Sequence, residues 1–226
     1  MTVAEIVIYV VAPLLGYLLG SVPFAFVIGK AHGVDIRKTG SGNIGATNLG
    51  RTLGKKYFFQ AFFLDMLKGL LPTLITALLV QHWATELPKW SPLITGMACM
   101  IGHLFPIYLG FKGGKGVATG LGIVLGFWPL FTLAGFGALI TFLVVFFVYR
   151  YISLSSIIGA AMFFLLVLLL GFGLLKPFGD MTVPSRELTP LLIVAGLFAG
   201  LIIVRHRSNI VRLMNGTEPK FGQKKP

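Results

Sequence analysis

A stretch of thirteen residues, 39–51 (TGSGNIGATNLGR), combines glycine with hydroxyl, amide and guanidinium side chains. Glycine lets the backbone come close to a ligand, and the planar fork of an arginine can grip a phosphate with two parallel hydrogen bonds. The side chains that can donate to such a ligand are those of Ser41, Asn43, Thr47, Asn48 and Arg51. The composition therefore predicts an anion-binding loop.

The same stretch contains Gly40, Gly42 and Gly45 in G-x-G-x-x-G spacing, and Asp65 follows about twenty residues later. That pattern is typical of a dinucleotide-binding loop when a strand precedes it and a βαβ unit surrounds it. Here the flanking segments are long apolar runs. We therefore favour a simple anion cradle over a dinucleotide site.

A second cluster alternates lysine with glycine in residues 111–116 (FKGGKG). It is not a Walker A loop, because only three residues separate Gly110 from Gly114 and because Gly116 stands where serine or threonine should follow the lysine. The cluster predicts a second anion cradle, formed by Gly113, Gly114 and Lys115, without a magnesium nucleotide.

A third cluster, 205–212 (RHRSNIVR), follows the last apolar run. If this segment is helical, His206, Asn209 and Arg212 lie on one face, at spacings of three residues. An R-H-R sequence beside a membrane can also be a plain topology anchor. Its occurrence with two other polar, basic clusters favours a functional site.

Two further pairs of reactive side chains lie inside apolar runs. Asp65 and Lys68 are three residues apart and share a helical face, so we expect an ion pair, either structural or in contact with substrate. Cys99 and His103 are four residues apart, which is compatible with a thiol nucleophile and its base, or with simple packing.

The composition places these clusters in a membrane protein. The 226 residues have a mean hydropathy of +0.89, and 56% of them are apolar against 12% charged. Repeated apolar runs of about twenty residues can each cross a bilayer. The net charge of +12 comes from lysine and arginine at the ends of these runs, which suits membrane topology and anionic lipid rather than nucleic acid.

The predicted fold is all-α: one polytopic domain, 1–226, with about seven transmembrane helices. The spans are expected at 5–29, 57–80, 92–109, 117–130, 131–149, 153–174 and 189–204. The run 117–149 is too long for one span, so we divide it at Trp128-Pro129. The first run lacks the basic start and cleavage site of a signal peptide, and we expect it to be retained.

The loops 30–56 and 110–116 and the tail 205–226 are expected in the cytoplasm. Together with Arg150 they hold 15 of the 19 lysine and arginine residues, which predicts an N-terminus outside and a C-terminus inside. Five spans, with some runs merged or re-entrant, would give the same orientation.

As an ordered set, these segments resemble the acylphosphate-dependent glycerol-3-phosphate acyltransferases of bacterial phospholipid synthesis, the PlsY family. The resemblance extends over nearly the whole chain and is carried by GSGNIGATNLGR, DMLKG, HLFPIYLGFKGGKGVAT and RHRSNIVRLMNGTE. The outer loop 175–188 is longer than the family usually has.

This resemblance implies a multi-pass enzyme of the bacterial inner (cytoplasmic) membrane with its active site on the cytoplasmic face. It implies transfer of an acyl group from acyl phosphate to the 1-hydroxyl of glycerol 3-phosphate, giving lysophosphatidic acid and phosphate. The implied catalytic residues are His206, Asn209 and Ser41. The implied substrate-binding residues are Asn43, Thr47, Arg51, Gly113, Gly114 and Lys115.

The chemistry of these residues fits that reaction. Both substrates carry phosphate and one has an apolar tail, so the site needs two anion cradles beside an apolar groove. An acyl phosphate is already activated, so alignment and charge stabilisation are sufficient without a covalent intermediate or cofactor. His206 or a substrate phosphate oxygen can accept the hydroxyl proton.

We expect no metal, because the few carboxylates form no magnesium pattern. The expected partners are glycerol 3-phosphate, acyl phosphate and membrane lipids, and no nucleic acid. The H-x-x-x-x-D pair of CoA-dependent glycerolipid acyltransferases does not occur after any of the four histidines.

The alternative from another class is a transporter of an anionic metabolite. Transporter sites lie near the middle of the bilayer on broken helices, often within an inverted repeat. Here the polar clusters are expected at one membrane face, and none of them occurs twice.

Overall fold

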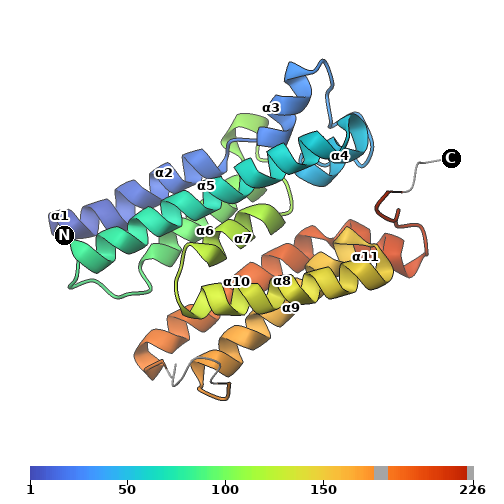
Figure 1. Ribbon diagram of the computed structural model, residues 1–226. Coiled ribbons are helices and arrows are strands. Elements are labelled where there is room, and N and C mark those ends of the chain that lie inside the picture. Colours follow the sequence, from blue (N-terminus) through green and yellow to red (C-terminus); the bar gives the residue numbers. More distant parts are fainter. Residues whose placement is uncertain (176–182, 223–226) are drawn as a thin grey trace. The chain divides into compact units, whose positions relative to one another are not determined.

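The computed structural model describes residues 1–175 and 183–222, and all secondary structure among them is helical (Figure 1). Six helical stretches are long and apolar enough to cross a membrane: Val3–Ala31, Lys55–His82, Pro92–Leu109, Leu130–Tyr149, Ile152–Gly171 and Ser185–Arg205. The predicted fold class, an all-α integral membrane protein, is confirmed. Part of the outer loop predicted at 175–188 lies outside the described residues.

The chain forms two compact units, Met1–Phe127 and Trp128–Pro226. The first unit contains α1 (Val3–Ile6), η1 (Val7–Val11), α2 (Ala12–Gly20), α3 (Phe24–Ala31), α4 (Ala46–Leu53), α5 (Lys55–His82), α6 (Pro92–Leu104), η2 (Ile107–Leu109) and α7 (Val117–Leu125). The second unit contains α8 (Leu130–Tyr149), α9 (Ile152–Gly171), α10 (Ser185–Arg205) and α11 (Arg207–Met214).

Glycine brings the helices of the first unit into close contact. Gly20 of α2 lies against the backbone of Cys99 in α6, and Gly102 of α6 lies against the backbone of Tyr17 in α2. Gly69 of α5 lies against the backbone of Thr119, and Gly122 of α7 lies against the backbone of Met66, so α5 and α7 also approach each other closely. Small residues at helix contacts are the usual way in which apolar helices pack inside a membrane.

The first apolar run bends at Pro23. α2 ends at Gly20, and α3 begins only at Phe24, because proline has no N–H to continue the helical hydrogen bonds. The Ser21 N–H and hydroxyl both donate to Tyr17 O, at 2.9 and 2.8 Å, at the end of α2. The run predicted as a single span, 5–29, is therefore an interrupted helix.

The predicted division at Trp128-Pro129 agrees with the helices, since α7 ends at Leu125 and α8 begins at Leu130. α7 has nine residues, which at 1.5 Å per residue cover roughly 14 Å, about half of a bilayer core. This helix is much shorter than the span predicted at 117–130. The seven-span layout, the orientation and the single domain stay predictions.

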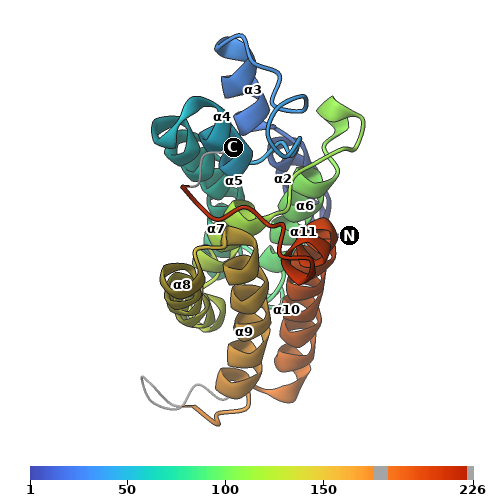
Figure 2. The same ribbon diagram turned by 90° about the vertical axis from the view of Figure 1, so that its right-hand side faces the viewer.

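The predicted cytoplasmic loop 30–56 contains a helix that the sequence analysis did not anticipate. α4 buries Ala46, Asn48 and Leu49 and is polar on its other side. A small apolar core that includes Ile36 and Leu49 holds it against the rest of the first unit. In the second unit, α8, α9 and α10 form a bundle, and the short helix α11 follows α10 (Figure 2).

Candidate functional site

The loop 39–51, called the Ser41 loop below, is folded around the buried amide of Asn48. Its Nδ2 donates to Ile36 O at 2.7 Å and to Thr39 O at 3.1 Å, and its Oδ1 accepts from the Ser41 N–H at 2.8 Å. Both amide protons are thus used inside the protein, and only 1% of the residue is exposed. Asn48 was expected among the ligand donors, but the structure makes it the internal anchor of the loop.

The other predicted ligand donors of the Ser41 loop are more open. Ser41 and Arg51 are exposed, and Asn43 and Thr47 are half-buried. Asn43 Oδ1 accepts from the Gly45 N–H at 3.0 Å, which stabilises the turn into α4. Thr47 and Arg51 are four residues apart on α4 and share a face. Thr47 lies in the first turn, where the helix dipole favours an anion, and Arg51 lies in the last turn.

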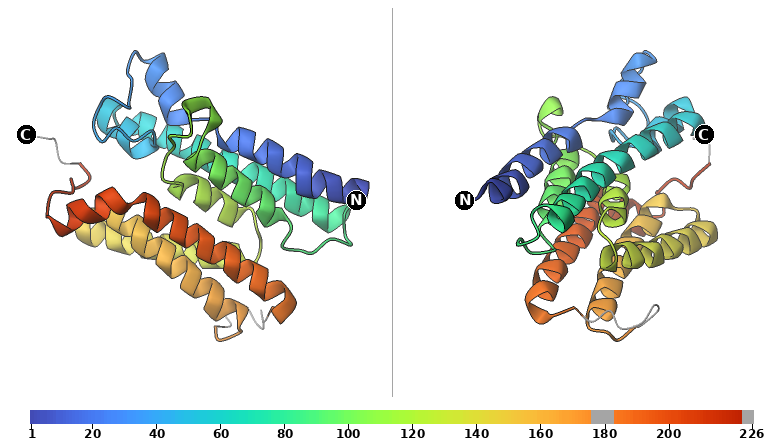
Figure 3. Two further views of the ribbon diagram at one scale, coloured as in Figure 1. Left: turned by 180° about the vertical axis from the view of Figure 1, so that it is seen from behind. Right: turned by 60° about the vertical axis from the view of Figure 1, so that its left-hand side comes forward.

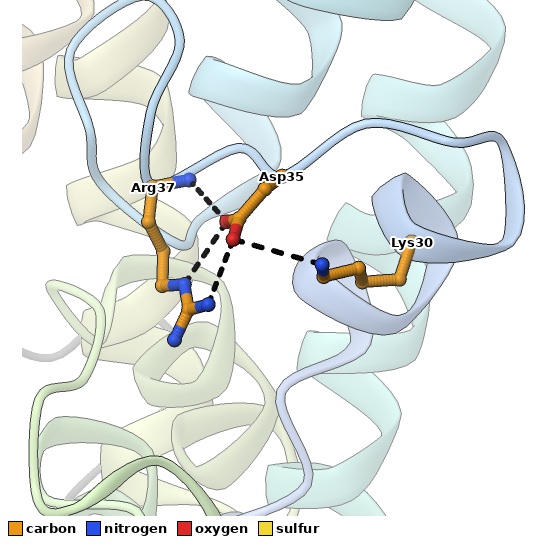
Figure 4. A network of polar contacts seen from close by, with 3 residues as sticks. All are labelled: Lys30, Asp35 and Arg37. Atoms are coloured by element: carbon orange, nitrogen blue, oxygen red, sulfur yellow. Dashed lines mark hydrogen bonds and ion pairs between the residues drawn. The ribbon is translucent and has the colours of Figure 1, made fainter.

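An ion cluster fixes the chain just before this loop (Figure 4). Arg37 donates to both oxygens of Asp35, at 2.9 and 2.7 Å, and Lys30 Nζ lies 3.7 Å from Asp35 Oδ2. The Arg37 guanidinium also lies 4.7 Å from the centre of the Phe26 ring. The hydrogen bond from the Arg37 side chain holds the pKa of Asp35 well below its usual range. The paired donors of Arg37 are thus used within this cluster.

The Gly-Lys loop, residues 110–116, rests on the end of α6. The Gly114 N–H donates to His103 O at 3.1 Å. A side chain on Gly113 would collide with the carbonyl oxygens of His103 and Leu104, so this glycine permits the close approach. Gly116 has a φ of +82° just before α7, a conformation that favours glycine. Lys115 lies between Gly114 and Gly116 in the chain and is half-buried.

The Ser41 loop and the Gly-Lys loop lie at the same end of the first unit (Figures 1 and 3). Leu109, the residue before the Gly-Lys loop, packs on the same apolar core as Ile36, Ile44 and Leu49 beneath the Ser41 loop. Two segments more than fifty residues apart in the sequence therefore pack on the same apolar core. This packing brings the two predicted anion cradles to one face of this unit.

The predicted pairing of Asp65 with Lys68 is confirmed. Lys68 Nζ lies 2.7 Å from Asp65 Oδ1 and donates to Val22 O at 2.7 Å, in the break between α2 and α3. Asp65 Oδ1 has no well-aligned hydrogen bond in spite of the short distance, so the contact is chiefly one of charge. His103 Nδ1 is 3.8 Å from the same oxygen. Cys99 is wholly buried, with its sulfur beside Gly16.

The third cluster lies in the second unit, at the junction of α10 and α11. His206 is 2% exposed, and its Nδ1 lies 2.7 Å from Ile202 O. A carbonyl oxygen can only accept, so Nδ1 carries the proton and a neutral ring keeps Nε2 as its acceptor. Nε2 can then take a proton, as a general base must.

Glu218 organises the remaining polar groups of this cluster. Its Oε1 accepts from Ser153 and from Asn209, both at 2.7 Å, and its Oε2 accepts from Arg212 at 2.7 Å. Burial alone would raise the pKa of Glu218, but the hydrogen bonds from Ser153, Asn209 and Arg212 together lower it below its usual value. The predicted alignment of Asn209 and Arg212 on one helical face is thus used to bind this carboxylate.

Sequence reasoning placed Glu218 beside the third cluster without a role, and it did not include Ser153. Glu218 had a signal, because it ends the motif RHRSNIVRLMNGTE, but Ser153 had none, since it is 65 residues away in the chain. Within the described ranges, no three His, Cys, Asp or Glu side chains gather as a metal site. The expectation of a metal-free reaction stays a prediction.

Comparison with known proteins agrees with the resemblance. Residues 10–216 match the family model described as glycerol-3-phosphate acyltransferase. The protein named glycerol-3-phosphate acyltransferase from Aquifex aeolicus is 42% identical over 208 residues, covering 92% of this chain and 96% of that protein. The protein of the same name from Trichlorobacter lovleyi is 44% identical, with coverages of 91% and 93%.

Two solved structures have a similar fold. The crystal structure of PlsY (YgiH), an integral membrane glycerol 3-phosphate acyltransferase, in its glycerol 3-phosphate form has a TM-score of 0.78 and 40% identity, and 94% of each chain is covered. The lysophosphatidic acid form of that protein has a TM-score of 0.76 at the same identity and coverage. The chain described here belongs to the glycerol-3-phosphate acyltransferase family.

Proposed function

We propose that this protein is a membrane acyltransferase that moves a fatty acyl group from acyl phosphate to the 1-hydroxyl of glycerol 3-phosphate. The products are lysophosphatidic acid and phosphate. The observation that carries the proposal is the 40% identity, over 94% of both chains, to a protein solved in a glycerol 3-phosphate form and in a lysophosphatidic acid form. The arrangement of polar groups in this chain supports it independently.

Two loops supply what two phosphate-bearing substrates require. The Ser41 loop offers Ser41, Asn43 and Thr47, with Arg51 in the last turn of α4, and the Gly-Lys loop offers Lys115 on a glycine-rich backbone that a ligand can approach closely. Charge-assisted hydrogen bonds from arginine and lysine hold phosphate oxygens and oppose the charge that develops during transfer. We assign Gly113, Gly114 and Lys115, with Thr47, Asn43 and Arg51, to substrate binding.

The transfer itself is a single displacement at the acyl carbon. The oxygen of the glycerol 3-phosphate hydroxyl forms a bond to this carbon, and the bond from the carbon to the phosphate oxygen breaks, so that inorganic phosphate leaves with the bonding electrons. The hydroxyl proton passes to His206 Nε2 or to a phosphate oxygen of the substrate. Asn209 and Ser41 act as hydrogen-bonding groups in this step.

A direct transfer suits the position of the only cysteine. Cys99 is fully buried between α6 and α2, where burial disfavours the thiolate that a thioester would require. Acyl phosphate is already activated, and an intermediate on the enzyme adds a step without lowering a barrier. We propose that no metal or cofactor takes part.

We place the enzyme in the bacterial inner membrane with both loops on the cytoplasmic side, where glycerol 3-phosphate is dissolved and the apolar acyl chain can stay in the bilayer. The excess of lysine and arginine in the loops 30–56 and 110–116 supports this orientation.

The test of the donor is a comparison of acyl phosphate with acyl-CoA, each offered with glycerol 3-phosphate to the purified protein in detergent or lipid. Lysophosphatidic acid should form with acyl phosphate and not with acyl-CoA. Formation from acyl-CoA alone would contradict the proposed donor, and transport of glycerol 3-phosphate into sealed vesicles without acylation would favour the transporter.

A further inference from the structure

His103 lies between a buried ion pair and the Gly-Lys loop. It belongs to the last turn of α6 and is 7% exposed. Its Nδ1 is 3.8 Å from Asp65 Oδ1. The opposite edge of the ring faces Gly114 so closely that a side chain there would collide with His103 Nε2. The ring therefore lies between Asp65 of α5 and Gly114 of the loop.

The backbone of the loop is fixed at the same point. The Gly114 N–H donates to His103 O at 3.1 Å, and Gly113 lies directly over the carbonyl oxygens of His103 and Leu104. Two consecutive glycines thus rest on the end of α6, one on its carbonyls and one on the His103 ring. Lys115 follows directly, so its position depends on this support.

The ring has a rigid support of its own. The side chains of Asp65 and Lys68 are 4% and 1% exposed, and their charged atoms are 2.7 Å apart. Lys68 Nζ also donates to Val22 O in the break after α2, so the pair joins α5 to the first bent helix. Burying two charges in an apolar interior is costly, and such groups are usually retained for a specific role. Here the pair fixes a carboxylate beside the imidazole.

We propose that His103 is a positioning residue for the Gly-Lys loop, and that the Asp65–Lys68 pair holds its ring in place. In this role His103 sets the backbone of Gly113 and Gly114 so that Lys115 can receive the phosphate of glycerol 3-phosphate. The identity of that phosphate rests on the proposed function. The proposed support of the loop by the His103 ring does not depend on that function.

The first test replaces the ring. His103→Ala should raise the KM for glycerol 3-phosphate by about tenfold, equivalent to about 1.4 kcal/mol of binding, and leave kcat within about threefold. A residue that serves only folding would lower the yield of folded protein without changing the KM of what remains. Cys99→Ala, one turn earlier on α6, is the matched control and should keep the parental KM.

The second test uses the steric contact between the ring and Gly114. The backbone of Gly114 is outside the left-handed region, unlike that of Gly110 or Gly116, so the ring is the obstacle to a side chain at this position. Gly114→Ala alone should therefore raise the KM for glycerol 3-phosphate. The double variant His103→Ala/Gly114→Ala should have the same KM as His103→Ala alone, because the new methyl group no longer meets the ring. Gly113→Ala should gain nothing from His103→Ala, because backbone carbonyls block that position.

The third test needs no activity. Hydrogen exchange of the Gly114 amide should become about tenfold faster in His103→Ala and stay at the parental rate in Cys99→Ala, because the loop opens more often without the ring. If the parental protein showed no acyl transfer, the proposed function would be wrong. The exchange rates would still test whether the His103 ring supports the loop. If the His103→Ala protein kept both the parental exchange rate and the parental KM, the inference would be wrong.

Discussion

The side-chain oxygen of Asn48 accepts a hydrogen bond from the backbone N–H of Ser41 at 2.8 Å. The two residues are seven positions apart, and the contact places Ser41 at the exposed tip of a loop whose anchor is completely covered. The backbone that carries the exposed Ser41 hydroxyl is therefore held by an amide whose two protons are both donated within the protein.

Asn48→Asp should destabilise this loop. The new oxygen would face Ile36 O and Thr39 O, which now accept from Nδ2, so two buried carbonyls would lose their donors. An unsatisfied buried acceptor costs about 1–3 kcal/mol, and the thermal unfolding midpoint should fall accordingly. Asn215→Asp makes the same change at an exposed position and should leave the midpoint unaltered. Equal midpoints for the two variants would show that Asn48 does not anchor the loop.

The ion pair between Asp65 and Lys68 predicts a marked asymmetry between single and double substitution. Lys68→Met leaves a buried carboxylate without its partner and should lower the free energy of unfolding by about 3–5 kcal/mol. Removing both charges in Asp65→Leu/Lys68→Met should recover most of that loss. Denaturation in detergent micelles measures both values. A double variant that is less stable than Lys68→Met would contradict this explanation of the pair.

Glu218 predicts a dependence of stability on pH. Its pKa is lower in the folded protein than in the unfolded chain, so its contribution to stability is present above the unfolded value of about 4.3 and is lost as the pH falls through the folded value. The unfolding midpoint should therefore drop on acidification below about pH 4.3, and less steeply in Glu218→Gln. Glu86→Gln, on the exposed connection between α5 and α6, serves as the control. Identical pH profiles for the parental protein, Glu218→Gln and Glu86→Gln would show that Glu218 does not cause the dependence of stability on pH.

The two loops assigned to phosphate predict a selective loss of activity. Lys115→Ala and Arg51→Ala should each lower kcat/KM by about 10- to 100-fold, because a hydrogen bond from a charged group contributes about 1.5–3 kcal/mol. Lys89→Ala, which removes an exposed lysine on the α5–α6 connection, should change kcat/KM by less than about twofold. Steady-state kinetics with both substrates varied would measure this, and parental values for Lys115→Ala and Arg51→Ala would refute the assignment.

The helical membrane fold could be predicted because long apolar runs indicate membrane helices and prolines indicate where such helices end. The pairing of Asp65 with Lys68 followed from helical spacing in the same way. The helix α4 was missed because its eight residues are mostly polar and its buried side depends on the core beneath the loop. The contact of Ser153 with Glu218 could not be predicted, since no local sequence pattern relates residues 65 positions apart.

The role of Asn48 shows a different limit of sequence reasoning. An asparagine in a glycine-rich loop can bind a ligand or satisfy the loop's own backbone, and both need the same residue type at the same spacing. Only the three hydrogen bonds to Ile36, Thr39 and Ser41 distinguish the two. Side chains that build a site and side chains that bind its ligand are thus hard to separate before the fold is known.

The central claim is direct acyl transfer from acyl phosphate to glycerol 3-phosphate, and one measurement addresses it. Purified protein is mixed with glycerol 3-phosphate and with acyl phosphate radiolabelled in its acyl group, and lysophosphatidic acid, phosphate and protein-bound label are quantified together. We predict equal amounts of the two products, an unchanged rate in Cys99→Ala, and a loss of at least about 10²-fold in His206→Ala if His206 is the general base. An acyl-enzyme that forms in the parent and is lost in Cys99→Ala, or phosphate released without lysophosphatidic acid, would contradict the account.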